Sequence, residues 1–84
     1  MNLEFDPQAI EDLRYLKKYE PKNAKRVIQL LKDIKKTPFT GLGKPESLRY
    51  GLSGKWSRRI NQKDRLVYEI KRDTIIVFQC RYHY

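Results

Sequence analysis

The chain has 84 residues, which is enough for one small domain, and we predict a single domain over residues 1–84. Lysine and arginine number 19 against 10 aspartate and glutamate residues, so the formal net charge is +9 and the expected partners are acidic or polyanionic. One cysteine and one histidine exclude an internal disulfide and a cysteine/histidine zinc cage, and no apolar run reaches the roughly 18 residues of a membrane span. We therefore expect a cytoplasmic domain without a membrane partner.

The first half of the chain predicts a short strand and two helices. Residues 3–5 form the strand, and Asp6-Pro7 begins the first helix, with Asp6 as N-cap and Pro7 at the first helical position. Glu20-Pro21 ends this helix, and the second one runs to Thr37-Pro38. Both helices repeat apolar residues with the 3.6-residue period of one buried face. The positions expected to be buried are Ile10, Leu13, Leu16, Tyr19, Ala24, Val27, Ile28, Leu31 and Ile34.

The second half changes to the pattern of a sheet. Residues 38–47 predict an irregular loop, residues 48–50 a short strand and residues 51–54 a turn. Strands are expected over residues 55–60, 65–70 and 74–82, with a turn over residues 61–64. We predict an α+β fold, in which the short strand and the two-helix hairpin pack on a twisted antiparallel β-sheet.

The sequence does not decide the register between the last two strands. A two-residue turn at Arg72-Asp73 places Arg65 opposite Cys80, and a three-residue turn places it opposite Gln79. A slip of one residue exchanges the two faces of a strand. With the two-residue turn Arg65 shares a face with Tyr82 and Tyr84, and with the three-residue turn it shares a face with Arg81 and His83.

Polar residues of the second half include the groups that cleavage of RNA by its own 2′-OH requires. A base takes the 2′-OH proton, an acid protonates the departing 5′ oxygen, and cations stabilise the charge on phosphorus. Glu46 or His83 can be the base, His83 can be the acid, and arginine can clamp phosphate. No cluster of carboxylates suggests a divalent ion, so we expect a reaction with neither metal nor cofactor.

The same residues also have plainer interpretations. Glu46 could do no more than sit in a loop and pair with Lys44 or Arg49, and the Arg58-Arg59 pair could simply protect a sheet edge. A histidine near a terminus is often no more than a solvated side chain. From these residues alone, the prediction is a basic α+β domain that binds RNA.

Three aromatic or sulfur-containing side chains are expected to be structural. Trp56 and Phe78 are assigned to the core rather than to a platform on which bases stack, and Cys80 to an inert buried position. Tyr82 and Tyr84 alternate with Arg81 and His83, which also resembles an RNA-stacking surface.

Three motifs resemble a known family. They are SGKWSRRI at residues 53–60, RLVY at residues 65–68 and RYHY at residues 81–84, joined by the loop Gly43-Lys44-Pro45-Glu46. Over its whole length the chain resembles the YoeB/Txe toxins of the RelE superfamily. This resemblance implies a RelE-like fold and an endoribonuclease that cuts mRNA in the ribosomal A site and so inhibits translation.

The resemblance also implies roles for single residues. Glu46 is the expected general base, His83 the general acid and Arg65 the stabiliser of phosphate charge, while Tyr84 helps to hold the substrate. The residues expected to bind RNA or phosphate are Lys44, Arg49, Arg58, Arg59 and Tyr82. Arg49 stands where we associate the family with lysine, which keeps the cation but changes its hydrogen-bond geometry.

The implied partners are an antitoxin, the ribosome and mRNA. A YefM/Axe-type antitoxin is expected to cover the sheet with an acidic flexible segment, and operator DNA is reached only through that complex. Ribosomal RNA is expected to contact a lysine-rich helical face made of Lys17, Lys18, Lys22, Lys25, Lys32, Lys35 and Lys36. Whether the free protein forms a homodimer is left open. The alternative function is a non-catalytic basic binding module, either a ParE-like poison or a ribosome- or RNA-binding protein.

Overall fold

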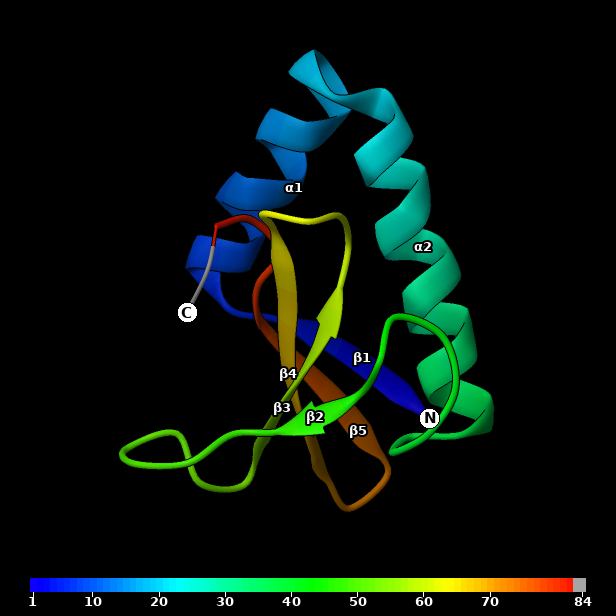
Figure 1. The fold of residues 1–84 in the computed structure, drawn as a ribbon, viewed down its shortest axis with the longest axis vertical. Coiled ribbons are helices and arrows are strands. Elements are labelled where there is room, and N and C mark those ends of the chain that lie inside the picture. The colour runs from blue at the N-terminus through cyan, green and yellow to red at the C-terminus, as the bar shows by residue number, and fades with distance from the viewer. Residues whose placement is uncertain (83–84) are drawn as a thin grey trace.

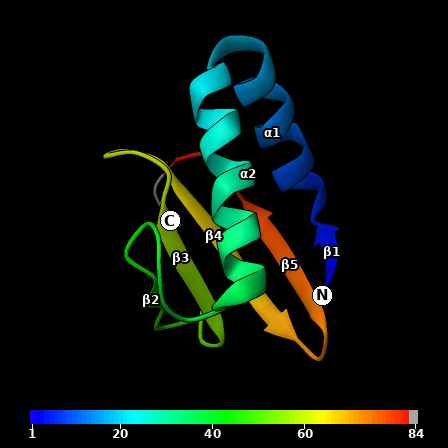
Figure 2. The same ribbon diagram turned by 90° about the vertical axis from the view of Figure 1, so that its right-hand side faces the viewer.

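In the computed structural model, which describes residues 1–82, a helical hairpin packs on a five-stranded sheet (Figures 1 and 2). The helices are α1 (Pro7–Tyr19) and α2 (Pro21–Lys36). The strands are β1 (Asn2–Phe5), β2 (Glu46–Ser47), β3 (Lys55–Arg59), β4 (Arg65–Lys71) and β5 (Thr74–Gln79). The predicted α+β fold is confirmed. The short strand expected over residues 48–50 lies earlier, at β2.

Both helices begin at the residues predicted from the sequence. The carboxylate of Asp6 accepts a hydrogen bond from the backbone N–H of Gln8 at 3.2 Å, and Pro7 occupies the first turn, where its missing N–H costs nothing. Pro21 begins α2 directly after Glu20, so the two helices form a tight hairpin. Within residues 1–82, neither helix has the length and apolar character needed to cross a bilayer.

The sheet is mixed, because its first strand runs parallel to its last. The strand order is β1-β5-β4-β3-β2, and the four strands from β2 to β5 pair antiparallel. β1 pairs parallel with β5, so that Leu3 lies beside Ile75. The predicted antiparallel sheet therefore gains a parallel edge strand.

The core lies between the hairpin and one face of the sheet. Its buried members include Leu66, Tyr68, Ile75 and Val77 from the strands. Since side chains alternate between the two faces of a strand, the neighbours of these residues lie on the opposite face, which neither helix covers. We call this opposite side the open face.

Four side chains that were expected in the core lie outside it, and one core residue was not expected. Ile10, Tyr19 and Ile28 are exposed, whereas Leu30, which was not expected in the core, is completely buried. On α2 the residues Ala24, Val27, Leu31 and Ile34 define a stripe that either Ile28 or Leu30 can flank. The sheet packs on the side of Leu30. Phe78 is also outside the core, with the Lys55 ammonium 4.6 Å from its ring centroid.

A β-bulge decides the register that the sequence left open. The turn at Arg72-Asp73 has two residues, because Lys71 pairs with Thr74. Pairing then skips Phe78, so that Val67 lies opposite Gln79, and the backbone N–H of Arg65 donates to the carbonyl of Tyr82 at 3.0 Å. Neither predicted partner of Arg65 is correct, since both alternatives assumed an uninterrupted ladder.

Substitutions on α2 can test which side of the helix is buried. We expect Leu30→Ala to lower the free energy of unfolding by about 2–5 kcal/mol, because it removes buried methyl groups and leaves a cavity. Ile28→Ala, on the exposed flank, should cost less than about 1 kcal/mol. Denaturant unfolding measures both values. Equal losses in the two variants would contradict the packing described.

Candidate functional site

The open face gathers three of the predicted site residues in two adjacent rows. In the first row, Glu46 of β2 pairs with Ser57 of β3. In the next row on this face, two residues further along β3, Arg59 pairs with Arg65 of β4. Ser57 and Arg59 are two residues apart on one strand and so share a face. The sheet therefore brings a carboxylate and two guanidinium groups to the same side.

Arg65 is half-buried and held by the turn that precedes its strand. Its Nη1 donates to the carbonyls of Asn61, Gln62 and Asp64 at 3.2, 3.4 and 3.3 Å. These contacts orient the guanidinium where β4 begins, one row from Glu46. An arginine held in this way needs little reorganisation to stabilise developing negative charge.

Two further predicted cations, Arg49 and Lys44, lie in loops on either side of Glu46. Arg49 is exposed and lines an open hollow of about 640 Å³ with Glu46 and Tyr50. This volume is in the range of small-molecule sites and would accommodate a nucleotide. Lys44 is exposed and lines a second hollow with Arg59.

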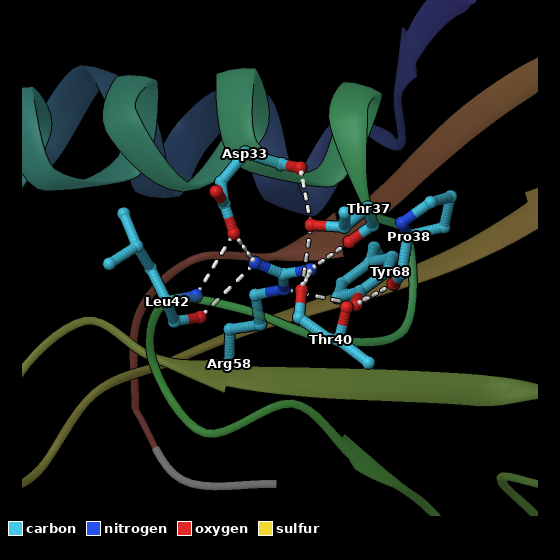
Figure 3. Close-up of polar contacts among 7 residues, drawn as sticks. All are labelled: Asp33, Thr37, Pro38, Thr40, Leu42, Arg58 and Tyr68. Carbon is cyan, nitrogen blue, oxygen red and sulfur yellow. Dashed lines mark hydrogen bonds and ion pairs between the residues drawn. The ribbon is translucent and has the colours of Figure 1, made fainter.

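Arg58 is completely buried, so the prediction that it binds phosphate is wrong (Figure 3). It lies opposite Leu66 and faces the helices, whereas Arg59 faces outward. All five N–H groups of the guanidinium donate to protein oxygens. None is left for a phosphate group.

The buried guanidinium instead connects α2, the loop after it and the sheet (Figure 3). Its Nη1 forms an ion pair with Asp33 at 2.5 Å, and its Nε donates to the hydroxyl of Tyr68 at 3.2 Å. Its remaining bonds go to backbone carbonyls of Thr37, Thr40 and Leu42. The loop that leads to Glu46 is thus anchored on a buried charge.

Two pKa shifts accompany this network. The backbone N–H of Leu42, which donates to Asp33 at 2.9 Å, and then Arg58 lower the pKa of the Asp33 carboxyl below its ordinary 3.8. Burial raises the pKa of Tyr68, whose hydroxyl donates to the carbonyl of Pro38 at 2.6 Å. Asp33 is therefore ionised and Tyr68 neutral under ordinary conditions.

The buried carboxylate of Asp64 holds the segment that follows β5. Asp64 is fully buried, and its Oδ1 accepts from the backbone N–H of Tyr82 at 2.7 Å. Its Oδ2 accepts from the side-chain amide of Asn61 at 3.0 Å, and the side-chain Oδ1 of Asn61 accepts the backbone N–H of Asp64 at 2.7 Å. The turn before β4 is thereby tied to the chain next to the predicted acid.

Tyr82 is exposed, and its ring contacts Arg81. The Arg81 guanidinium lies 3.2 Å from the ring centroid of Tyr15 and 4.4 Å from that of Tyr82. This stack fixes Tyr82 near the amino-terminal half of the chain. The predicted acid His83 and the predicted substrate contact Tyr84 lie outside the described residues.

Cys80 is as inert as predicted. It is fully buried, and burial, followed by the charges of Asp12 and Asp64, raises the pKa of its thiol to about 12. A thiol with this pKa is no nucleophile near neutral pH. Within residues 1–82, no group of three histidine, cysteine or acidic side chains is placed to hold a metal ion.

Asp33 and Asp64 are structurally central, and sequence reasoning missed both. The Asn61 and Asp64 pair has a local signal, since asparagine and aspartate in a turn commonly bond to nearby backbone groups. Asp33 has none, because 25 residues separate it from Arg58 along the chain.

Comparisons with known proteins agree with this architecture. The sequence model of a family described as the YoeB-like toxin of bacterial type II toxin-antitoxin system matches residues 5–84. Toxin YoeB from Escherichia coli strain K12 is 42% identical over 84 residues, which is 100% of both chains. The solved YoeB dimer from Staphylococcus aureus superposes with a TM-score of 0.94 at 42% identity, over 100% of this chain and 98% of that one. The YoeB–YefM complex from the same organism gives a TM-score of 0.92 with equal identity and coverage.

The hairpin on a mixed five-stranded sheet is therefore the fold of a class of small bacterial toxins. Within that class, the chain belongs to the YoeB-like toxins of bacterial type II toxin–antitoxin systems. The resemblance seen in the motifs is confirmed.

The ion pair between Arg58 and Asp33 leads us to expect a specific loss of stability in acid. Because the pKa of Asp33 is lower in the folded state than in the unfolded chain, ionised Asp33 stabilises the fold at neutral pH, and this contribution is lost as the pH falls below 3.8. Asp33→Asn should be less stable than the wild type at neutral pH, with the difference shrinking below about pH 4. Urea unfolding across this range measures the difference, and a constant gap would contradict the assignment.

An exchange of side chains tests the contact between Asn61 and Asp64. Asp64→Asn alone should lower the free energy of unfolding by about 1–3 kcal/mol, since two amide NH₂ groups then face each other. Adding Asn61→Asp restores one acceptor and one donor, so the double variant should recover most of the loss. Denaturant unfolding of the single and double variants gives their coupling energy. Simple additivity would show that these side chains do not act together.

Proposed function

We propose that this protein is the toxin of a type II pair and acts as a ribosome-dependent mRNA endonuclease that cuts in the A site and inhibits translation. The observation that carries this proposal is the placement of Glu46 on the open face, one row from Arg59 and Arg65. A carboxylate beside two guanidinium groups supplies a base together with stabilisation for a phosphorane-like transition state.

The proposed reaction needs no metal ion. Glu46 takes the proton of a 2′-OH, the freed oxygen attacks the adjacent phosphorus, and Arg65 stabilises the added negative charge. His83 protonates the departing 5′ oxygen, and Tyr84 helps to hold the substrate. Arg49 and Arg59 contact neighbouring phosphates, and Tyr82 offers an exposed ring for base stacking.

The shallow shape of the site supports dependence on the ribosome. Glu46, Arg49 and Arg59 are all exposed, so the protein alone encloses no RNA strand. Positioning of the reacting groups contributes up to about 7–11 kcal/mol to catalysis. A ribosome that holds mRNA in an extended form would supply this positioning from outside.

The charge of the helices supports contact with ribosomal RNA. All seven lysines of the lysine-rich helical face are exposed. They lie on the hairpin, which packs on the side of the sheet away from the open face. The protein can thus bind ribosomal RNA with one side and mRNA with the other.

The antitoxin partner is inferred from the relatives. The Staphylococcus aureus YoeB is solved in complex with YefM and also as a dimer. We infer that a YefM-type antitoxin binds this protein as well, and that an acidic segment covers the cationic open face. Homodimer formation by the free toxin follows from the same relatives, and operator DNA is bound only together with the antitoxin.

Cleavage on programmed ribosomes tests the proposal. Wild-type protein should cut mRNA at the A-site codon, and much faster than it cuts the same RNA in solution. Glu46→Gln and His83→Ala should each lower the rate by about 10²–10⁴-fold, since each removes one proton-transfer group. Primer extension maps and quantifies the cuts.

Glu69→Gln is the matched control. Glu69 lies on the same face but pairs with Lys55, on the side of Glu46 away from the arginines. This variant should cut at nearly the wild-type rate. Translation arrest with intact message would overturn the nuclease assignment and leave a poison that acts by occupancy.

A further inference from the structure

Three cations from three different elements converge on one open hollow. Arg26 of α2, Lys44 of the loop before β2 and Arg59 at the end of β3 line a space of about 370 Å³. The amide side chains of Asn61 and Gln62 line it as well. Within residues 1–82, no carboxylate is among its lining residues.

A backbone hydrogen bond holds the segment that carries Lys44 beside Arg59. The carbonyl of Gly43 accepts the backbone N–H of Arg59 at 2.7 Å, which holds the loop against β3. Gly43 has a φ of +79°, and a Cβ there would stand 3.0 Å from the Arg59 carbonyl oxygen and 3.0 Å from the Leu30 side chain. Only glycine fits this close approach without displacement, and Lys44 follows directly.

Such an arrangement attracts an anion. Three positive charges around one hollow repel one another, and no acidic group in its lining offsets that repulsion. Guanidinium and ammonium groups together with side-chain amides are the donors that phosphate oxygens accept. The chemistry of the hollow therefore matches a phosphodiester group.

Arg59 connects the hollow to the open face. It pairs with Arg65 one row from Glu46, and it also lines the hollow. A strand of RNA held at Glu46 and Arg65 would reach the hollow with its next phosphates. Arg26, which is half-buried on α2, contributes to the hollow from the helical hairpin.

We propose that this hollow binds a backbone phosphate of the substrate RNA strand, adjacent to the one at the cleavage site, and that Arg26 is an RNA-binding residue. The proposal rests on the proposed function, whose substrate strand it extends. The occupant is the single strand that is cut, rather than ribosomal RNA, because Arg59 belongs to both the hollow and the open face.

Binding of a short 2′-O-methyl oligoribonucleotide tests this proposal without any cleavage, since the 2′ oxygen is blocked. Arg26→Ala should weaken binding about tenfold and reduce the slope of log K against log salt by about 0.7, the value for one phosphate contact on a single strand. Fluorescence anisotropy at several salt concentrations measures both quantities.

Arg14→Ala is the matched control, because Arg14 is an exposed helical arginine outside the hollow. It should leave the affinity and the salt slope close to those of the wild type. Equal effects of Arg26→Ala and Arg14→Ala would overturn the proposal, because only the overall charge would then matter.

A second experiment distinguishes the substrate RNA strand from ribosomal RNA as the source of the bound phosphate. Binding to ribosomes without mRNA should be the same for Arg26→Ala and the wild type. A loss confined to these ribosomes would overturn the assignment to the substrate strand. If the wild type cuts no mRNA on programmed ribosomes but Arg26→Ala still weakens oligonucleotide binding selectively, the nuclease assignment fails and the phosphate site stands.

Discussion

The buried guanidinium of Arg58 is the constraint around which the rest of the structure is arranged. A charge without access to water is tolerated only when it is paired and fully hydrogen-bonded. Asp33 supplies the countercharge from α2, and carbonyls of the following loop supply most remaining acceptors. The loop must therefore adopt the one conformation that directs these carbonyls inward. Because this loop leads into β2, the same bonds determine where Glu46 lies.

The neighbouring arginines of β3 show how strongly the sheet controls chemistry. Arg58 and Arg59 are identical in type and adjacent in sequence, yet one is enclosed by hydrogen bonds and the other is exposed. Alternation along the strand assigns them to opposite faces. Arg59 thereby joins Arg65 and the hollow beside Arg26, and Arg58 stabilises the scaffold beneath them.

Under the proposed function, the two sides of the protein have different roles. The open face carries the reacting groups and leads into the hollow where a neighbouring phosphate is proposed to bind. The helical side carries lysines that are suited to a large polyanion. A shallow site that relies on its partner to position the substrate is compatible with a small domain, which has too little interior to enclose an RNA strand.

Local chemistry in the sequence determined the helix boundaries at Asp6 and Pro21, the turn before Arg65, and motifs sufficient to recognise the family. The family resemblance of those motifs assigned site roles to Glu46, Arg59 and Arg65, which the sheet brings to one face. Tertiary structure alone decided that Arg58 is buried, that Leu30 rather than Ile28 enters the core, and that a bulge at Phe78 shifts Arg65 toward Tyr82. Caps, breakers and turns act within a few residues, so a sequence displays them directly. Burial and register depend on which distant segments meet, and no local pattern records that.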